Sequence, residues 1–302
     1  MLTIFALPKP FKGHVGVIQR NAVSQWTRLR PKPEILLFGG EEGTAEIAQE
    51  FGVRNIPEIK RNRYGTPLLS DLFERVHVLA SNNILCYVNA DIMLLGNFMK
   101  AVQQVSARRN HFLMVGRRTN VDLDEPSIYA SPEQETRLLA LVLDRGRLAA
   151  PNAIDYFVFP RELFPTFPPF AIGRPWWDNW FLWKARKSHA ALIDASETVL
   201  ALHQNHEYVL RDGSLDVMEC NEAKQNRSLA GRGFCTIEDA THKFTTDGIT
   251  YNFRHLLPAT KRVIRPWWRV VSKISAPIRH PLGLRRETIV SMLSRIRALA
   301  NR

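Results

Sequence analysis

Residues 84–95 place polar side chains inside an otherwise apolar run. Asn89 and Asp91 separate the strand-forming residues ILCYV from the apolar residues IMLL. An Asn and an Asp commonly form a turn where a strand ends. In an open α/β sheet, an acid at a strand end can also bind a ligand, and a carboxylate suits Mg²⁺ or Mn²⁺ together with phosphate oxygens. These residues alone leave both interpretations open.

The loop KRNRYGTP, residues 60–67, collects positive charge immediately before an expected helix. Lys60, Arg61 and Arg63 supply charge for a diphosphate, and Gly65 lets the backbone come close to it beside a helix N-terminus. The alternative is a solvated basic loop. The position of the loop, directly before the strand that ends at Asp91, favours phosphate binding.

Four tryptophans surround Asp178 in the segment GRPWWDNWFLW, residues 173–183. Aromatic side chains often stack on sugar rings, and a carboxylate among them can take a proton from a hydroxyl group. We therefore predict that Trp176, Trp177 and Asp178 contact an acceptor and that Asp178 is catalytic, as the base if the reaction inverts configuration. If configuration is retained, Asp178 would instead orient the acceptor. The helical spacing of the tryptophans also indicates that some are core residues, and Asp178 could simply be a first-turn acid that favours the helix.

Apolar runs and helical periodicities alternate along the first hundred residues and must position these side chains. Strands are expected at 2–7, 34–38 and 84–88, and helices at 17–29, 44–51 and 66–79, with a short strand before the third helix. Pro67 suits the first turn of that third helix, and Gly52 suits the end of the second. This order predicts an α/β fold with a largely parallel central sheet and helices on both faces.

The second half of the chain is less regular. Strands are expected at 111–116 and 153–159, a helix at 131–143 and another at 176–187, followed by apolar runs at 190–194 and 199–208. Ser131 is the expected N-cap of the helix that begins with Pro132. We predict one domain at 1–255 and a separate tail at 256–302.

Composition excludes several classes of protein. Hydrophobic residues make up 45% of the 302, which argues against disorder, and no apolar stretch reaches the roughly 18 to 20 residues that span a bilayer. The opening residues are too short an apolar run for a signal peptide. The three cysteines show no metal or disulfide spacing, so a reducing, cytoplasmic location is expected.

The net charge of +12 is concentrated in the tail. Residues 261–302 hold eleven Lys or Arg and one acid, a net +10, which leaves +2 for the preceding 260 residues. Arginines alternate with apolar residues at helical spacing near the end, a pattern typical of an amphipathic helix on an anionic membrane. The alternatives are a helix packed on the domain and an RNA-binding segment. Because the domain itself is nearly neutral, no nucleic-acid partner is expected.

The order of these motifs resembles that of the GT-A fold glycosyltransferases, the nucleotide-diphospho-sugar transferase superfamily. The strand ending in Asn89 and Asp91, the preceding KRNRYGTPLLSDLF and the later GRPWWDNWFLWKA are similar to segments of bacterial and plant members. The resemblance covers about residues 1–255. It implies a Rossmann-like GT-A fold and transfer of a sugar from a nucleotide-diphosphate donor to an acceptor hydroxyl.

In that family, the last acid of the strand-end triplet holds a divalent metal that bridges the donor's phosphates. The resemblance gives this role to Asp91, with Mn²⁺ or Mg²⁺. Asn89 replaces the family's first acid and is expected to bind the donor's ribose or sugar. The second metal ligand is expected to be His203, because it follows an apolar run as Asp91 does, with His206 as the alternative.

The resemblance also implies further donor contacts from Pro8, after the first strand, and Glu41, after the second. Glu41, or its neighbour Glu42, would accept a hydrogen bond from the base or ribose, unless these acids only complement the next helix N-terminus. The expected partners are a UDP- or GDP-linked sugar and a glycan or lipid-linked glycan acceptor. The tail at 261–302 would place the enzyme peripherally on the inner face of the cell membrane.

Two other functions fit parts of the pattern. A nucleotidyltransferase could use the same strand-end acid, but it would normally carry a Gly-rich basic loop after the first strand. The corresponding LPKPFKGHVG has Gly13 and Gly16 without clustered glycines. The other function is a non-catalytic module that binds RNA or membrane through the tail, and it leaves the strand-end acids unexplained.

Overall fold

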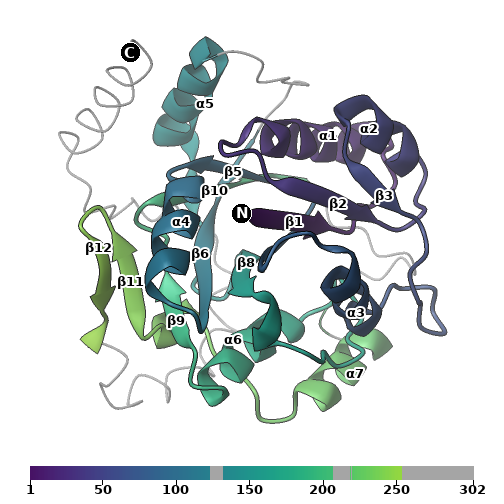
Figure 1. The fold of residues 1–302 in the computed structure, drawn as a ribbon. Helices are drawn as coiled ribbons and strands as arrows, with labels where there is room; N and C mark the ends of the chain where they lie inside the picture. The colour runs from purple at the N-terminus through teal and green to yellow at the C-terminus, as the bar shows by residue number, and fades with distance from the viewer. Residues whose placement is uncertain (123–131, 207–217, 219, 254–302) are drawn as a thin grey trace, which may run out of the picture. The chain divides into compact units, whose positions relative to one another are not determined.

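The computed structural model describes residues 1–122, 132–206, 218 and 220–253 (Figure 1). The predicted N-cap Ser131 and the predicted tail at 256–302 lie outside these residues. None of the helices within the described ranges is long and apolar enough to cross a membrane.

The described residues form twelve strands. Their bounds are β1 Leu2–Ala6, β2 Glu34–Phe38, β3 Arg54–Ile56, β4 Ile84–Val88, β5 Ile92–Gly96, β6 Phe112–Val121, β7 Arg147–Leu148, β8 Ile154–Pro160, β9 Ala191–Asp194, β10 Val199–Gln204, β11 His242–Thr245 and β12 Gly248–Tyr251.

The main sheet has the strand order β12-β11-β9-β6-β8-β4-β1-β2-β3. Its parallel pairs are β1 with β2 and β4, β2 with β3, and β9 with β6 and β11. Only β8 and β12 run against the others, because each pairs antiparallel with its neighbours. The predicted mostly parallel α/β sheet is therefore confirmed.

Seven α-helices and two short 3-10 helices accompany these strands in the described part of the chain. The α-helices are α1 Gly13–Arg28, α2 Thr44–Phe51, α3 Leu69–Leu79, α4 Phe98–Arg108, α5 Pro132–Arg145, α6 Trp177–Lys187 and α7 Asn221–Ala230, and the 3-10 helices are Arg161–Leu163 and Ile237–Asp239.

Helices cover both faces of the sheet. Successive side chains of a strand point to opposite faces, so the apolar strands present hydrophobic residues on both sides. On one face, Ile4 of β1 belongs to a core cluster with residues of α1, α2 and α4. On the other face, Phe5 joins a cluster with residues of α3 and α6. The second cluster is strongly aromatic: Phe73 of α3 lies 5.5 Å from Phe181 of α6 between ring centroids. Two packed layers thus hold the central strands between them.

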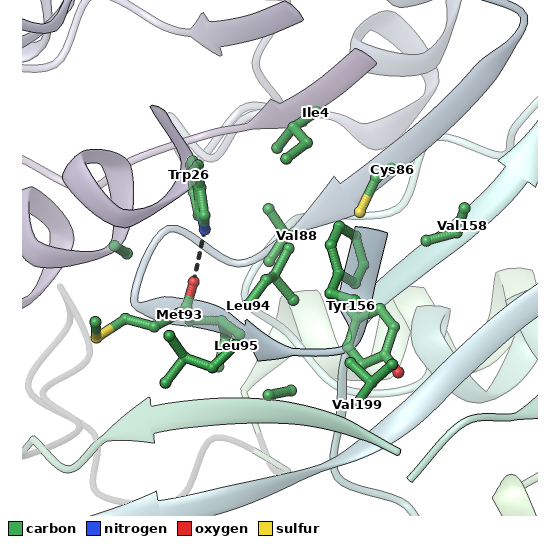
Figure 2. Close-up of a cluster of buried hydrophobic side chains, with 14 of the residues drawn as sticks. Ile4, Trp26, Cys86, Val88, Met93, Leu94, Leu95, Tyr156, Val158 and Val199 are labelled. Atoms are coloured by element: carbon green, nitrogen blue, oxygen red, sulfur yellow. Dashed lines mark hydrogen bonds between the residues drawn. The ribbon is translucent and has the colours of Figure 1, made fainter. Parts of the chain in front are cut away.

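The apolar run at 84–95 forms two strands instead of one. β4 belongs to the main sheet, whereas β5 turns away after Asp91 and pairs antiparallel with β10. Trp26 of α1 fixes β5 in place, because its indole Nε1 donates a hydrogen bond to the Ile92 carbonyl at 2.8 Å (Figure 2). Gln25 also bonds to both backbone polar groups of Leu94. The polar residues 89–91 are therefore the junction between two strands of different sheets.

Several elements differ from the sequence prediction. Helix α1 begins at Gly13, four residues before its predicted start at residue 17. Helix α3 begins at Leu69, not at Thr66, and Pro67 forms a β-bridge with Arg61 instead of the first helical turn. Strand β6 continues to Val121, five residues past the predicted end at residue 116. Helices α4 and α7 and the β11–β12 hairpin were not predicted.

Candidate active site

The carboxyl ends of β1 and β4 lie at one edge of the sheet, because these strands run parallel. β4 leads into Asn89 and Asp91, and β1 leads into the buried Pro8 and the exposed Lys9. β8 runs in the opposite direction, so its second residue, Asp155, lies at the same edge. This edge is where open α/β sheets bind their ligands.

Asp91, His203 and His206 form a cluster at this edge. Antiparallel pairing of β10 with β5 sets His203 opposite Ile92, directly beside Asp91. The Nε2 atom of His206 lies 3.2 Å from Asp91 Oδ2, and Nε2 of His203 lies 3.7 Å from the same oxygen. One donor atom from each residue lies within 4.8 Å of the others. The structure thus unites Asp91 with both histidines that the sequence offered as alternatives.

The donor set of this cluster suits a divalent cation. Asp91 Oδ1 and both ring nitrogens of His203 are buried and have no hydrogen-bond partner among the described residues. Buried polar atoms are nearly always hydrogen-bonded, so three such atoms beside one another require an explanation. Carboxylate and imidazole together bind metals such as Mn²⁺. A cation bound between Asp91 and His203 would satisfy Asp91 Oδ1 and one ring nitrogen of His203.

The protonation states fit the same role. Burial acts to raise the pKa of Asp91, but the hydrogen bond with His206 and the nearby His203 and Lys9 hold it below its ordinary value. Burial lowers the pKa of His203, so its imidazole is neutral near pH 7. A carboxylate and a neutral imidazole are the forms that bind metal.

Asn89 is held by a buried polar network beside the cluster. Its Oδ1 accepts a hydrogen bond from the Tyr87 hydroxyl at 3.0 Å, and its Nδ2 donates to Asp155 Oδ1 at 2.6 Å. The other oxygen of Asp155 accepts a hydrogen bond from Arg118 Nη1 at 3.0 Å. Burial raises the pKa of Asp155, and the Arg118 guanidinium opposes this shift.

Asp178 occupies the first turn of α6. Its Oδ1 accepts a hydrogen bond from the Asn179 backbone N–H at 2.9 Å. Burial raises the pKa of Asp178 to about 7; the Asn179 hydrogen bond opposes the shift and the charge of Asp155 adds to it. A carboxyl group with this pKa can exchange protons at neutral pH, which is the property required of a general base.

The two adjacent tryptophans have different environments. Trp176 adopts a φ of 88°, a strained value for a residue other than glycine, and its partly exposed ring lies under the Arg227 guanidinium, 5.2 Å from the ring centroid. The Trp177 side chain is buried, and its ring lies 5.3 Å from both Tyr87 and Phe157. This corrects the prediction that Trp177 contacts an acceptor, because a ring packed in the core has little surface left for one.

The basic loop is anchored by acids. The Lys60 backbone N–H donates to Asp71 Oδ2 at 2.8 Å, and Arg61 Nη2 lies 3.0 Å from Glu41 Oε1. Glu41 and Arg61, both predicted to bind the donor, are therefore ion-paired with each other. Arg63 is exposed, and its guanidinium lies 4.8 Å from the ring centroid of the neighbouring tyrosine.

The turn of the loop depends on Gly65, which has a φ of 78°. The Gly65 carbonyl also accepts a hydrogen bond from Arg61 Nη1 at 2.9 Å. Asn62 Nδ2 donates to Glu222 Oε1 of α7 at 2.7 Å, which attaches the loop to the segment before α6 through the Arg174–Glu222 ion pair.

Three charged residues of the site were not predicted. Asp155 carried a usable signal, since it is an acid inside the apolar run AIDYFVF, just as Asp91 interrupts its own run. Lys9 lies three residues past the end of β1, and its charge contributes to lowering the pKa of Asp91. Arg118 had no signal, because it belongs to the unpredicted extension of β6.

No protein-family model matches the chain, and no curated protein matches it. Solved structures are similar to it in fold. One of them is S. aureus TarS 1–349 in complex with UDP-GlcNAc, with a TM-score of 0.49 and 10% identity over 76% of this chain and 65% of that one. This chain therefore spans less than two thirds of that TarS structure.

Two further matches have similar levels of likeness. M. tuberculosis glucosyl-3-phosphoglycerate synthase in complex with Mn²⁺, UDP and phosphoglyceric acid has a TM-score of 0.46 and 14% identity, over 76% of this chain and 78% of that one. The mannosyltransferase PcManGT from Pyrobaculum calidifontis, in complex with GDP-Man and Mn²⁺, has a TM-score of 0.41 and 13% identity, over 70% of this chain and 58% of that one. At these identities, the function rests on the residues of the site itself.

Proposed function

We propose that this chain is a metal-dependent glycosyltransferase of the GT-A type. It would transfer a sugar from a nucleoside-diphosphate donor to an acceptor hydroxyl. The observation that carries the proposal is the cluster of Asp91, His203 and His206 at the carboxyl ends of the parallel strands, in which buried atoms of Asp91 and His203 lack hydrogen-bond partners among the described residues. Asp178, with a pKa of about 7, provides a proton acceptor in the same part of the fold.

Asp91, His203 and His206 would hold Mn²⁺ or Mg²⁺. When bound, the cation supplies a Lewis acid that neutralises charge on the leaving diphosphate. The chain adds its own positive charge around the cluster. Lys9 acts electrostatically on Asp91, and Arg118 acts on His203. Both side chains are therefore placed to attract an anionic donor to this edge of the sheet.

Asp178 would take the proton from the acceptor hydroxyl. As the hydroxyl oxygen forms a bond to the anomeric carbon, the bond from that carbon to the diphosphate oxygen breaks, and the proton moves to a carboxylate oxygen of Asp178. The exposed part of the Trp176 ring, two residues away, offers a surface for an acceptor sugar. The acceptor class we propose is a glycan or lipid-linked glycan.

The donor would be a UDP- or GDP-linked sugar. Glu41, after β2, is the proposed contact for the base or ribose, and Arg63 of the basic loop is the proposed contact for phosphate. Lys60 and Arg61 would contribute through the shape of the loop as well as through charge, since each already contacts an acid. We further propose a cytoplasmic enzyme, held on the inner face of the membrane by the basic tail.

Release of nucleoside diphosphate tests the proposal. The protein is incubated with Mn²⁺ and a panel of UDP- and GDP-sugars, and the release of UDP or GDP is measured with and without glycan acceptors. Turnover that requires Mn²⁺ and is lost in Asp91→Ala supports a transferase. Pyrophosphate release from nucleoside triphosphates, without cleavage of nucleotide sugars, would instead identify a nucleotidyltransferase.

A further inference from the structure

Asp155 is a buried acid at the candidate site that the proposed mechanism has not used. It is 7% exposed, and both of its carboxylate oxygens accept hydrogen bonds, one from Asn89 Nδ2 and one from Arg118 Nη1. Its backbone carbonyl also accepts a hydrogen bond from the Asn89 N–H at 2.9 Å. Asp155 therefore contacts Asn89 through both main chain and side chain.

These contacts control the turn that presents Asp91. The turn is short, because the Ile92 N–H already donates to the Asn89 carbonyl at 3.1 Å. With its backbone bonded to Asp155 and its amide held between Tyr87 and Asp155, Asn89 has little freedom to rotate. Because Asp91 lies only two residues later, the fixed position of Asn89 also restricts the position of Asp91. Removing a group that fixes a metal ligand in this way typically weakens metal binding about 10- to 100-fold.

Asp155 also adds a negative charge beside the turn formed by residues 89–91. The turn has an amide at Asn89 and a carboxylate at Asp91, so it brings only one negative charge to the cluster. Asp155 adds a second carboxylate from β8, in direct contact with the amide. It also orients the Arg118 guanidinium, whose charge reaches His203. The Asp155 side chain thus holds the Asn89 amide and the Arg118 guanidinium in place and adds a carboxylate beside the cluster.

We propose that Asp155 is a positioning residue for the transfer reaction, acting through Asn89 and Arg118 to fix the metal-binding turn and to supply the acid that the turn lacks. This inference rests on the proposed function, since it assigns a role within the same site. It also specifies the two positions that share this role. Positions 89 and 155 together must supply one amide and one acid in direct hydrogen-bond contact.

The exchange of these two residues is the sharpest test. Asp155→Asn alone places an amide nitrogen against either Asn89 or Arg118, so one of the two contacts is lost. The double variant Asn89→Asp with Asp155→Asn reverses the direction of the hydrogen bond between the two positions. The new amide at position 155 would donate to the new carboxylate at position 89 and accept from Arg118, and the Tyr87 hydroxyl would still donate to position 89. The exchanged pair therefore keeps every contact and the same net charge.

Mn²⁺ binding to each full-length variant is measured by calorimetry, followed by UDP and GDP binding in the presence of Mn²⁺. A matched control is Glu34→Gln, which removes a hydrogen-bonded carboxylate at the start of β2, at the opposite edge of the sheet. Thermal unfolding of all variants is recorded in parallel, so that a change in affinity is separated from a change in stability.

We expect Asp155→Asn to weaken Mn²⁺ binding by about tenfold or more, the exchanged pair to return to within about threefold of wild type, and Glu34→Gln to bind Mn²⁺ normally. Wild-type affinity in a folded Asp155→Asn would overturn the inference. So would an exchanged pair that does not fold, or one that folds without binding Mn²⁺. Failure of the wild type itself to bind Mn²⁺, UDP or GDP would instead overturn the proposed function.

Discussion

Asp178 shows how burial prepares a single side chain for chemistry at neutral pH. Burial raises its pKa to about 7, so the group is protonated below that pH and is a carboxylate above it. Because only the carboxylate can accept the hydroxyl proton, kcat/KM for sugar transfer should rise about tenfold per pH unit below the pKa and level off above it. The measurement is a pH profile on both sides of neutrality at saturating Mn²⁺.

Asp178→Asn is the companion variant. It should lower kcat by a factor of roughly 10² to 10⁴, the usual contribution of a general base. Its residual rate should no longer rise through neutral pH. A residual rate with the wild-type pH profile would show that another group accepts the proton.

The same raised pKa predicts an effect on stability. An acid whose pKa is higher in the folded state binds its proton more tightly there, so the contribution of Asp178 to stability is greatest below about pH 4 and is lost as pH rises through about 7. Asp178→Asn removes this penalty and keeps an oxygen for the Asn179 N–H. At about pH 8 the variant should be more stable than wild type by on the order of 2 to 4 kcal/mol, measured by urea unfolding. A variant less stable than wild type at that pH would contradict the burial of a charged Asp178.

At the residue scale, the sequence indicated the acid and the imidazoles but not their support. Asp91 and His203 are recognisable because each ends an apolar run, which places it at a strand end. Their meeting depends on β5 leaving the main sheet to pair with β10, a long-range event. Arg118 could not be predicted for a similar reason: the extension of β6 is stabilised by pairing with β7 and β10, which are distant in sequence.

At the scale of elements, β5 is held against α1 by side-chain hydrogen bonds as well as by packing. Trp26 is fully buried and donates to the Ile92 carbonyl (Figure 2). Trp26→Phe keeps an aromatic ring but removes this donor, and it should destabilise the protein by about 2 kcal/mol, since a buried carbonyl loses a partner. Because Ile92 follows Asp91, the variant should also weaken Mn²⁺ binding. Chemical denaturation and calorimetry measure the two effects.

Trp183→Phe provides the matched control for that substitution. Trp183 is partly exposed on α6 and lies beneath the Lys187 ammonium group. Its replacement should change stability by no more than about 0.5 kcal/mol and leave Mn²⁺ binding unaltered. Equal losses in the two variants would show that the Trp26 hydrogen bond has no special role in holding β5.

Elements with strong local signals were predicted with correct bounds. β2 and α2 match their predicted ranges, and Gly52 ends α2 in a left-handed conformation as expected. The start of α3 was wrong, because long-range contacts outweighed the preference of proline for a first helical turn. Pro67 pairs with Arg61 and Leu68 with Ala171, which holds the chain extended until Leu69.

At the scale of the whole molecule, charge separates the domain from the tail. The +10 of residues 261–302 predicts binding to anionic vesicles at low salt and release at high salt, because the attraction is screened. Flotation with phosphatidylserine-containing liposomes measures this for the full chain. Neutral phosphatidylcholine liposomes are the control. Equal binding to both kinds of vesicle, or no binding at low salt, would contradict the membrane role of the tail.

The central claim is that Asp91, His203 and His206 form a metal-dependent site for a nucleoside diphosphate. Its most direct test is calorimetric titration of UDP and GDP, with and without Mn²⁺, into wild type and Asp91→Ala. We predict that the wild type binds at least one of the two nucleotides only when Mn²⁺ is present, and that Asp91→Ala abolishes this binding. Binding that is indifferent to both Mn²⁺ and the substitution, or no binding at all, would contradict the claim and leave Asp91 as a residue of the turn between β4 and β5.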